Sequence, residues 1–385
     1  MKTINNTINA HYDFELHSEN QRTVDYSLCL PDGKIKGLIV YISGFGSDSG
    51  AYRNNFQKYI CDNHSMACLT VDYHCFFSRP GNGAKVLIEK STMNLLRSIT
   101  GCINDEDVDT VLFELGKINS NPKVPIKVPA TIYPKKNEYQ NFGILPALDN
   151  LFAINDVFIK YPNIPKTVYA IGSSYGGYIA NLMSKLAPCT LNAVFDNSSW
   201  ANPNMKYIIG EGLGTPEFQP NVAVSPNIVF SANVLSPWSY LAILPNGFDA
   251  NRQLIRSFPE EHLAIMAEVG KTKTIYRFVH SENDTIADTE QKLFLANTMK
   301  NKGFNVQIII YSKNDIDGQY IKTMDHGMKL SMKTFFSNSI DQIEDLIQDD
   351  KCIDFDFKHS LHFACKTKKY TVKYQGNSQP ICSVS

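Results

Sequence analysis

The segment GSSYG at residues 172–176 carries a G-x-S-x-G pattern with Ser174 at its centre. The apolar run at 167–171 predicts a strand that leads into the pattern, and the residues after it predict a helix. Glycines are needed in such a tight turn, because a Cβ at Gly172 or Gly176 would collide with the neighbouring strand or helix. A serine on this turn projects its hydroxyl above the carboxyl edge of the sheet, where it can act as a nucleophile.

A serine hydroxyl needs an adjacent base, and the base needs an acid that orients it. On a strand-turn-helix scaffold these partners are expected downstream in the order Asp, His, each just after a strand. Asp284 follows a predicted strand at 274–279, and His326 follows the next one at 306–311. We therefore assign Ser174 as nucleophile, Asp284 as orienting acid and His326 as general base and then general acid.

Three other carboxylates are alternatives to Asp284 as the acid. Glu282 lies two residues from Asp284. Asp288 opens the following helix, a position typical of an N-cap. Asp196 ends the strand after the nucleophile, where some lipase-like enzymes carry their acid. These alternatives stay open at the level of the sequence.

Acyl transfer also needs hydrogen-bond donors for a developing oxyanion. The backbone N–H of Tyr175 directly follows the nucleophile at a helix N-terminus. The second donor is expected in the loop Ser43-Gly44-Phe45-Gly46, after the apolar run at 37–42, and the N–H of Phe45 is the candidate. This loop has neither the spacing nor the Lys-Ser/Thr ending of a phosphate-binding loop, so it does not predict a nucleotide site.

Composition excludes several other classes. The chain of 385 residues has 37 basic and 38 acidic side chains, so no net field would attract nucleic acid or anionic lipid. The histidines show no ligand spacing beyond His359 and His362, and we expect neither a metal nor a cofactor. The nine cysteines are scattered and include no C-x-x-C pair, which favours free thiols in the cytoplasm. We expect no signal peptide, because the N-terminal residues lack its pattern. We also expect no membrane span, because no stretch of 18 apolar residues occurs. The oligomeric state is not predicted.

Alternation of short β-branched runs with amphipathic stretches predicts an α/β protein with a mainly parallel, twisted sheet and helices on both faces. Strands are expected at 12–16, 24–30, 37–42, 66–72, 167–171, 191–195, 274–279 and 306–311, with another possible at 370–374. Helices are expected at 51–63, 145–160, 177–186, 289–302 and 328–347, and one amphipathic stretch lies at 84–99.

Two irregular regions break this alternation, at about 73–139 and 197–259. Both are too long for plain connections, and we interpret them as insertions that form a lid or cap rather than as a second domain. The catalytic domain is then expected to span 1–347. Residues 348–385 form a C-terminal appendage to which the sequence assigns no role.

The chain resembles the α/β-hydrolase superfamily from about Tyr12 to Ile347. The glycine-rich loop after the first buried strand, the GSSYG turn, the HSEND segment and the DHG segment occur in family order. The spacing of His280 and Asp284 resembles the acid loop of the prolyl-oligopeptidase-like branch, although the propeller of those enzymes is absent. Where the family carries His-Gly at the oxyanion loop, this chain has Ser43-Gly44.

The stretch NFGILPALD at 141–149, with the long insertions, resembles a group of hydrolase-like proteins from Campylobacter and its relatives associated with flagellin glycosylation. That resemblance implies an acylated sugar or glycan precursor as substrate. The leading hypothesis is a cytoplasmic serine esterase acting on a small-molecule ester. An acyltransferase on the same triad, or a non-catalytic accessory protein that keeps the fold, are the alternatives.

Overall fold

The computed structural model describes residues 1–17, 21–45, 50–103, 107–119, 121, 123–210, 227–271, 273–347 and 352–385. Contacts within the chain divide it into two compact units. The first comprises Met1–Phe76, Asn141–Pro203 and Asp249–Ser385, and the second comprises Phe77–Gln140 and Asn204–Phe248. Most residues of the insertions expected at 73–139 and 197–259 lie in the second unit, but 73–76, 197–203 and 249–259 belong to the first.

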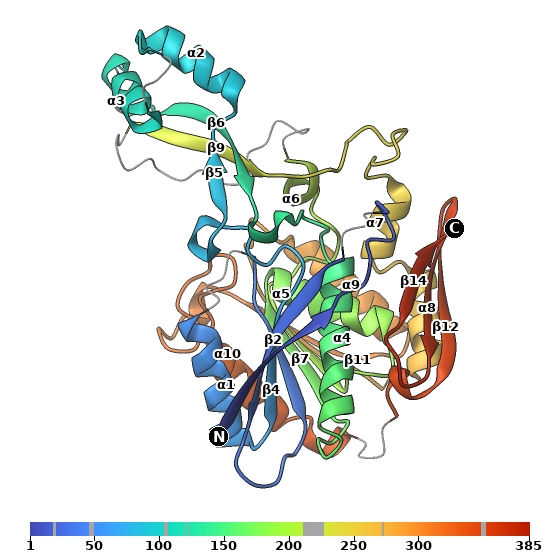
Figure 1. Ribbon diagram of the computed structural model, residues 1–385. Coiled ribbons are helices and arrows are strands. Elements are labelled where there is room, and N and C mark those ends of the chain that lie inside the picture. Colours follow the sequence, from blue (N-terminus) through green and yellow to red (C-terminus); the bar gives the residue numbers. More distant parts are fainter. Residues whose placement is uncertain are drawn as a thin grey trace. The chain divides into compact units, whose positions relative to one another are not determined.

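The first unit is built around an eight-stranded sheet with the order β1-β2-β4-β3-β7-β8-β10-β11 (Figure 1). Strand β2 runs antiparallel to β1 and β4, and the pairings from β4 through β11 are parallel. The strands are β1 (Lys2–Asn9), β2 (Thr23–Leu30), β3 (Leu38–Ile42), β4 (Ala67–Asp72), β7 (Val168–Ser173), β8 (Ala193–Asn197), β10 (Ile275–Ser281) and β11 (Asn305–Tyr311).

Helices cover both faces of this sheet. Helices α1 and α10 pack together on one face, and α4 and α5 pack together on the other. This order and layering confirm the predicted α/β-hydrolase fold. The helices of this unit are α1 (Ala51–His64), α4 (Ile144–Lys160), α5 (Tyr175–Leu186), α7 (Ala250–Arg256), α8 (Glu260–Gly270), α9 (Thr289–Asn301) and α10 (Met332–Ile340).

The central elements form where the sequence is apolar enough to be covered on both sides. Every residue of β3, with the sequence LIVYI, is buried, as a strand between two helical layers requires. Helix α5 is buried along its whole length, which fixes the turn that precedes it. No helix in the described part of the chain is both long and apolar enough to cross a bilayer.

The expected first strand at 12–16 is wrong. The outer strand is β1 at Lys2–Asn9 instead, paired in register with β2. Its sequence KTINNTIN is mostly polar because β1 lies at the edge of the sheet, and this hides the strand from a hydrophobic pattern. Residues 12–16 turn instead, because the Asp13 carboxylate accepts the backbone N–H groups of Glu15 and Leu16.

The expected helix at 328–347 is also too long. Helix α10 begins only at Met332, after Ser331 caps it by accepting the N–H of Thr334. Met328 and Lys329 have φ of 56° and 43°, a left-handed backbone that a helix cannot contain. The segment that follows His326 is therefore a tight turn.

The second unit joins the two inserted segments through one small sheet. Strand β6 (Ile126–Tyr133) pairs antiparallel with β5 (Lys85–Leu87) and parallel with β9 (Ile228–Val234), which comes from the second segment. Helices α2 (Lys90–Thr100) and α3 (Val108–Ile118) supply apolar side chains to its core, and the short α6 (Met205–Ile209) also belongs to this unit.

The C-terminal residues form a three-stranded antiparallel sheet of β12 (Lys358–Cys365), β13 (Lys368–Gln375) and β14 (Ile381–Val384). The expected strand at 370–374 lies inside β13. Strand β12 contacts α7 and α8, so this sheet is part of the first unit.

A buried ion pair ties this tail to the rest of the unit. The Arg256 guanidinium on α7 forms two hydrogen bonds to the Glu15 carboxylate, at 2.9 and 2.5 Å, and Tyr370 on β13 donates a third at 3.0 Å. The side chains of Arg256 and Glu15 are 0% and 1% exposed. Burial alone would raise the pKa of Glu15, but Arg256 outweighs it and the pKa is lowered, so the carboxylate stays charged.

Glu15→Gln should therefore destabilise the protein strongly, because it leaves the Arg256 charge buried without its counter-ion. Removal of one partner of a buried pair costs about 3–5 kcal/mol. Urea unfolding measures the change, and Glu260→Gln is the control, since its pair with Lys302 is largely exposed and worth about 1 kcal/mol or less. Equal shifts of the two unfolding midpoints would contradict the anchoring role of Glu15.

Candidate active site

Ser174 lies on a strained turn between β7 and α5. Its backbone has φ of 55° and ψ of −122°, a conformation that costs a non-glycine residue about 1–3 kcal/mol. The glycines on either side make the turn possible. A Cβ on Gly172 would lie within 3.0 Å of the Gly176 backbone, and a Cβ on Gly176 would lie within 3.0 Å of the Ile42 backbone. The predicted steric reason for both glycines is thereby confirmed.

The structure brings the three predicted residues together. His326 Nε2 lies 2.7 Å from Ser174 Oγ, and His326 Nδ1 lies 2.8 Å from Asp284 Oδ2. His326 comes from the loop between β11 and α10, and Asp284 comes from the loop after β10. One imidazole thus bridges a serine hydroxyl and a carboxylate, the arrangement that lets a histidine remove a proton from serine.

The acid is held by its own loop. Asp284 Oδ1 accepts the backbone N–H groups of Ile286 and Ala287, both at 2.9 Å. Burial raises the pKa of Asp284, but the hydrogen bond and charge of His326, together with these amides, outweigh it and lower the pKa. The carboxylate therefore stays ionised beside the imidazole.

Buried His280 braces the same loop. Its Nε2 lies 2.8 Å from the Ala287 carbonyl, so Nε2 carries the proton because a carbonyl can only accept. Burial lowers the pKa of His280, which keeps the ring neutral. The sequence placed His280 in the acid loop and assigned it no role of its own.

The rival acids are engaged elsewhere. Asp196 forms a fully buried ion pair with Lys292 of α9 at 2.5 Å. Asp288 caps α9 by accepting the N–H of Gln291, as its position in the sequence suggests. Glu282 is exposed and accepts the N–H of Lys313. Of the four carboxylates considered, Asp284 is the one that bonds His326.

The two residues expected to supply oxyanion donors are neighbours. Tyr175 is the first residue of α5, and its ring lies edge-on to the Phe45 ring with centroids 5.3 Å apart. The hydroxyl of Tyr73 donates to the Ser43 carbonyl at 2.8 Å and so holds the loop that precedes Phe45. Gly46, the last residue of that expected loop, lies outside the described residues.

Asn197, at the end of β8, connects these loops. Its carbonyl accepts the N–H of Ser174 at 2.7 Å. Its side-chain Nδ2 donates to Ser173 Oγ at 3.1 Å and to the Gly327 carbonyl, next to His326, at 3.0 Å. One side chain, 1% exposed, thus ties the serine turn to the histidine loop. The sequence offers only a weak signal for it, a polar residue at a strand end.

Trp200 closes one side of the triad. Its indole N–H donates to the Ile286 carbonyl at 2.8 Å, and its ring centroid lies 6.0 Å from that of His326. The same ring contacts Phe142 and Tyr175. The Trp200 ring therefore forms an apolar surface between the acid loop and the start of α5.

The described residues hold no group of three or more His, Cys, Asp or Glu side chains arranged to bind a metal ion. All nine cysteines are free thiols.

The lowered pKa of Asp284 predicts a pH-dependent stability. Its folded-state pKa lies below the unfolded value of about 3.9, so the ionised carboxylate stabilises the fold above about pH 4, and this contribution is lost as pH falls through the folded pKa. Urea midpoints of the native chain and Asp284→Asn should differ most at neutral pH and converge under acid conditions. A difference that grows below pH 4 would contradict the lowered pKa.

Comparison with curated proteins gives no match to this chain. Among solved structures it is similar to an acylaminoacyl peptidase from Pyrococcus horikoshii, at 12% identity and a TM-score of 0.45, over 89% of this chain and 41% of that one. It is also similar to a carboxyl esterase from Bacillus coagulans, at 12% identity and a TM-score of 0.45, over 90% of this chain and 100% of that one. A third similar structure is Est1E from Butyrivibrio proteoclasticus with ferulic acid bound. It is 12% identical, with a TM-score of 0.42, over 84% of this chain and 96% of that one.

This chain thus spans less than half the length of the peptidase. At such identities and TM-scores, these likenesses carry no argument about activity. The sequence itself matches one family, described as "Protein of unknown function (DUF2920)", over residues 5–380. Because this match covers nearly all of the 385 residues, the chain belongs to the DUF2920 family.

Proposed function

We propose that the protein is a serine hydrolase that cleaves carboxylic esters through an acyl-enzyme at Ser174. The observation that carries the proposal is the position of the His326 ring, with Nε2 2.7 Å from Ser174 Oγ and Nδ1 2.8 Å from Asp284. A base must lie within hydrogen-bond reach of the proton that it removes, and this distance meets that condition.

In the proposed reaction Ser174 Oγ attacks the ester carbonyl while His326 Nε2 takes its proton. The backbone N–H groups of Phe45 and Tyr175 are the proposed donors to the resulting oxyanion. The imidazolium, stabilised by Asp284, returns the proton to the leaving alcohol oxygen, and the acyl group remains on Ser174. Water then attacks the acyl-enzyme with His326 again as base, which releases the acid and restores the serine.

The substrate class is part of the proposal. The resemblance to hydrolase-like proteins associated with flagellin glycosylation favours an acylated sugar or glycan precursor. We propose that the substrate is selected by the two inserted segments, which are additions to a plain hydrolase domain. A cytoplasmic location is proposed as well, on the free thiols of the chain.

An acyltransferase on the same triad is the second candidate. It would differ only in the acceptor of the acyl group, an alcohol in place of water. Analysis of the products with and without an alcohol acceptor separates the two, and hydrolysis that outpaces transfer at saturating acceptor supports the esterase.

A fluorophosphonate probe should label the folded protein on Ser174, because the probe reacts with serines that a neighbouring base activates. Ser174→Ala should abolish labelling and lower ester turnover on the order of 10⁶-fold, the loss seen when a triad serine is removed. Ser360→Ala, which changes an exposed serine of β12, is the control and should leave both unchanged. An unlabelled, folded chain would reject the proposal in favour of a non-catalytic accessory protein.

Asn197→Ala should lower kcat with little change in KM, because the variant frees the histidine loop from the serine turn. Displacement of a catalytic group by about 1 Å can cost about 100-fold. Steady-state kinetics on a p-nitrophenyl ester measures the effect. Asn202→Ala is the matched control, since exposed Asn202 bonds only Gln291 among the described residues. An unchanged kcat in folded Asn197→Ala would show that this side chain does not position the triad.

A further inference from the structure

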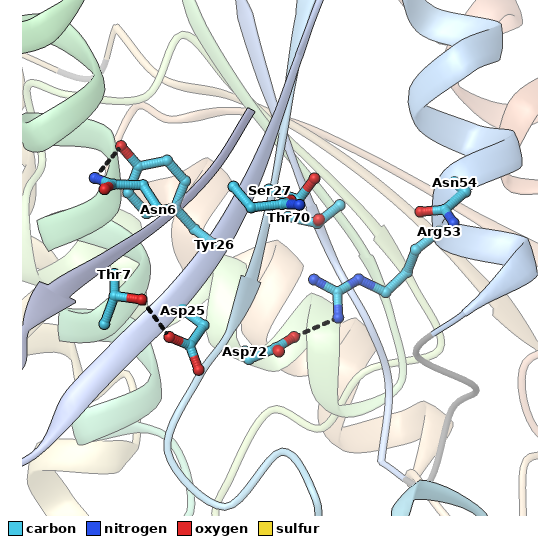
Figure 2. A pocket seen from close by; sticks show the side chains of 10 residues that line it. Asn6, Thr7, Asp25, Tyr26, Ser27, Arg53, Asn54, Thr70 and Asp72 are labelled. Atoms are coloured by element: carbon cyan, nitrogen blue, oxygen red, sulfur yellow. Dashed lines mark hydrogen bonds and ion pairs between the residues drawn. The ribbon is translucent and has the colours of Figure 1, made fainter. Parts of the chain in front are cut away.

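The eight-stranded sheet ends on two strands of opposite character, β1 on one side and β11 on the other. Strand β1 is polar, and its side chains are bonded to β2. Figure 2, a close view of this region, shows Thr7 bonded to the Asp25 carboxylate, at 2.7 Å. Asn6 donates to the Tyr26 hydroxyl at 3.1 Å, and Lys2 at the start of the strand is exposed. Polar and charged side chains of this kind protect a sheet edge against pairing with another chain.

Strand β11 lacks that protection. Its sequence NVQIIIY contains no charged residue and no proline. Ile309 is 39% exposed, and Ile308 and Ile310 are only partly buried. In the part of the chain that the structure describes, no strand lies beyond β11 on this side of the sheet. An exposed apolar edge strand is a template for pairing with a further strand.

The hydrogen bonds to β10 show which backbone groups of β11 point outward. The two strands are parallel, and the Tyr311 carbonyl accepts the N–H of Glu282, just after β10. Alternate residues of a parallel strand bond to the neighbouring strand, so every second residue counted back from Tyr311 directs its N–H and C=O at β10. The backbone groups of Val306, Ile308 and Ile310 therefore point to the open edge.

A second copy of β11 fits this edge when the two strands run antiparallel about a two-fold axis at Ile308. The outward groups of Ile308 then face those of the partner's Ile308, and the groups of Val306 face those of the partner's Ile310. Residues that face each other in this way exchange two hydrogen bonds in each pair. The apolar residues are spaced evenly on either side of Ile308, so every hydrogen-bonded pair also joins apolar side chains. No like charges meet, because β11 carries no charge.

We propose that β11 pairs with β11 of a second copy, so that the protein forms a two-fold dimer with one continuous sheet. Such a contact uses the same surface on both copies and closes on itself, which leaves only the protected β1 edges exposed. The seven residues of β11 span about 23 Å, at about 3.3 Å per residue. An interface centred on one short strand is small, so we expect a dissociation constant in the micromolar range. The proposal does not rest on the hydrolase activity.

Analytical ultracentrifugation of the full chain at increasing concentration tests the proposal. The native chain should change from the mass of one chain to the mass of two. Gln307→Glu combined with Ile309→Glu should raise the dissociation constant about 100-fold, because Gln307 lies opposite the partner's Ile309 and two pairs of like charges then face each other. Both side chains are exposed, so the double variant should fold.

Two matched variants serve as controls. Gln307→Glu combined with Ile309→Lys changes the same two positions but places opposite charges across the axis, so it should dimerise about as the native chain does. Thr3→Glu combined with Asn5→Glu adds two negative charges to exposed positions of β1, at the other edge of the sheet, and should leave dimerisation unchanged.

Hydrogen exchange resolved to single amides identifies the surface that pairs. The N–H groups of Val306, Ile308 and Ile310 should become protected as the concentration of the native chain rises, and should lose this protection in the double-glutamate variant. The N–H of Ile309 should stay protected in both, because it faces β10.

Three results would overturn the proposal. The first is a native chain that keeps the mass of one chain up to about 100 µM, well above the micromolar range of weak interfaces. The second is a dimer that persists in the folded double-glutamate variant, since it would use another surface. The third is loss of the dimer in the glutamate–lysine variant as well, because charge across the two-fold axis would then not explain the effect.

Discussion

The backbone at Ser174 is the constraint on which the rest of the site depends. With φ of 55° the serine leaves β7 and enters α5 without an intervening loop. The turn is possible because Gly172 and Gly176 lack a Cβ, which would collide with the backbone of Gly176 and of Ile42 respectively. The strain is held in place by a helix buried along its full length and by a central strand buried on both faces. The fold thus fixes the backbone position of Ser174 independently of Asp284 and His326.

The partners are held to that turn by a few buried polar groups. Asn197 links the serine turn to the histidine loop, and the Asp196–Lys292 pair anchors the strand end on which Asn197 lies. On the acid side, two amides and neutral His280 shape the loop that presents Asp284. Asn197, Asp196, Lys292 and Asp284 thus find hydrogen-bond partners inside the protein.

Much of this site could be predicted from the sequence because its three side chains lie in segments that follow apolar, easily recognised strands. Ser174 and Asp284 come within three residues of the ends of β7 and β10, and His326 lies in the longer loop that follows β11. Strand β1 was missed because an edge strand needs few apolar residues. Asn197, Arg256 and Glu15 were missed because their partners are far away in sequence, 241 positions for the ion pair, and no local pattern records such a contact.

The proposed chemistry requires that His326 activates Ser174 to form an acyl-enzyme. Stopped-flow measurement with p-nitrophenyl acetate tests it most directly, because the first half-reaction releases one p-nitrophenol for each serine acylated. We expect a burst of about one equivalent per chain, followed by slower turnover, and no burst for Ser174→Ala. The same burst from the native chain and Ser174→Ala, or equal steady-state turnover by the two, would contradict it.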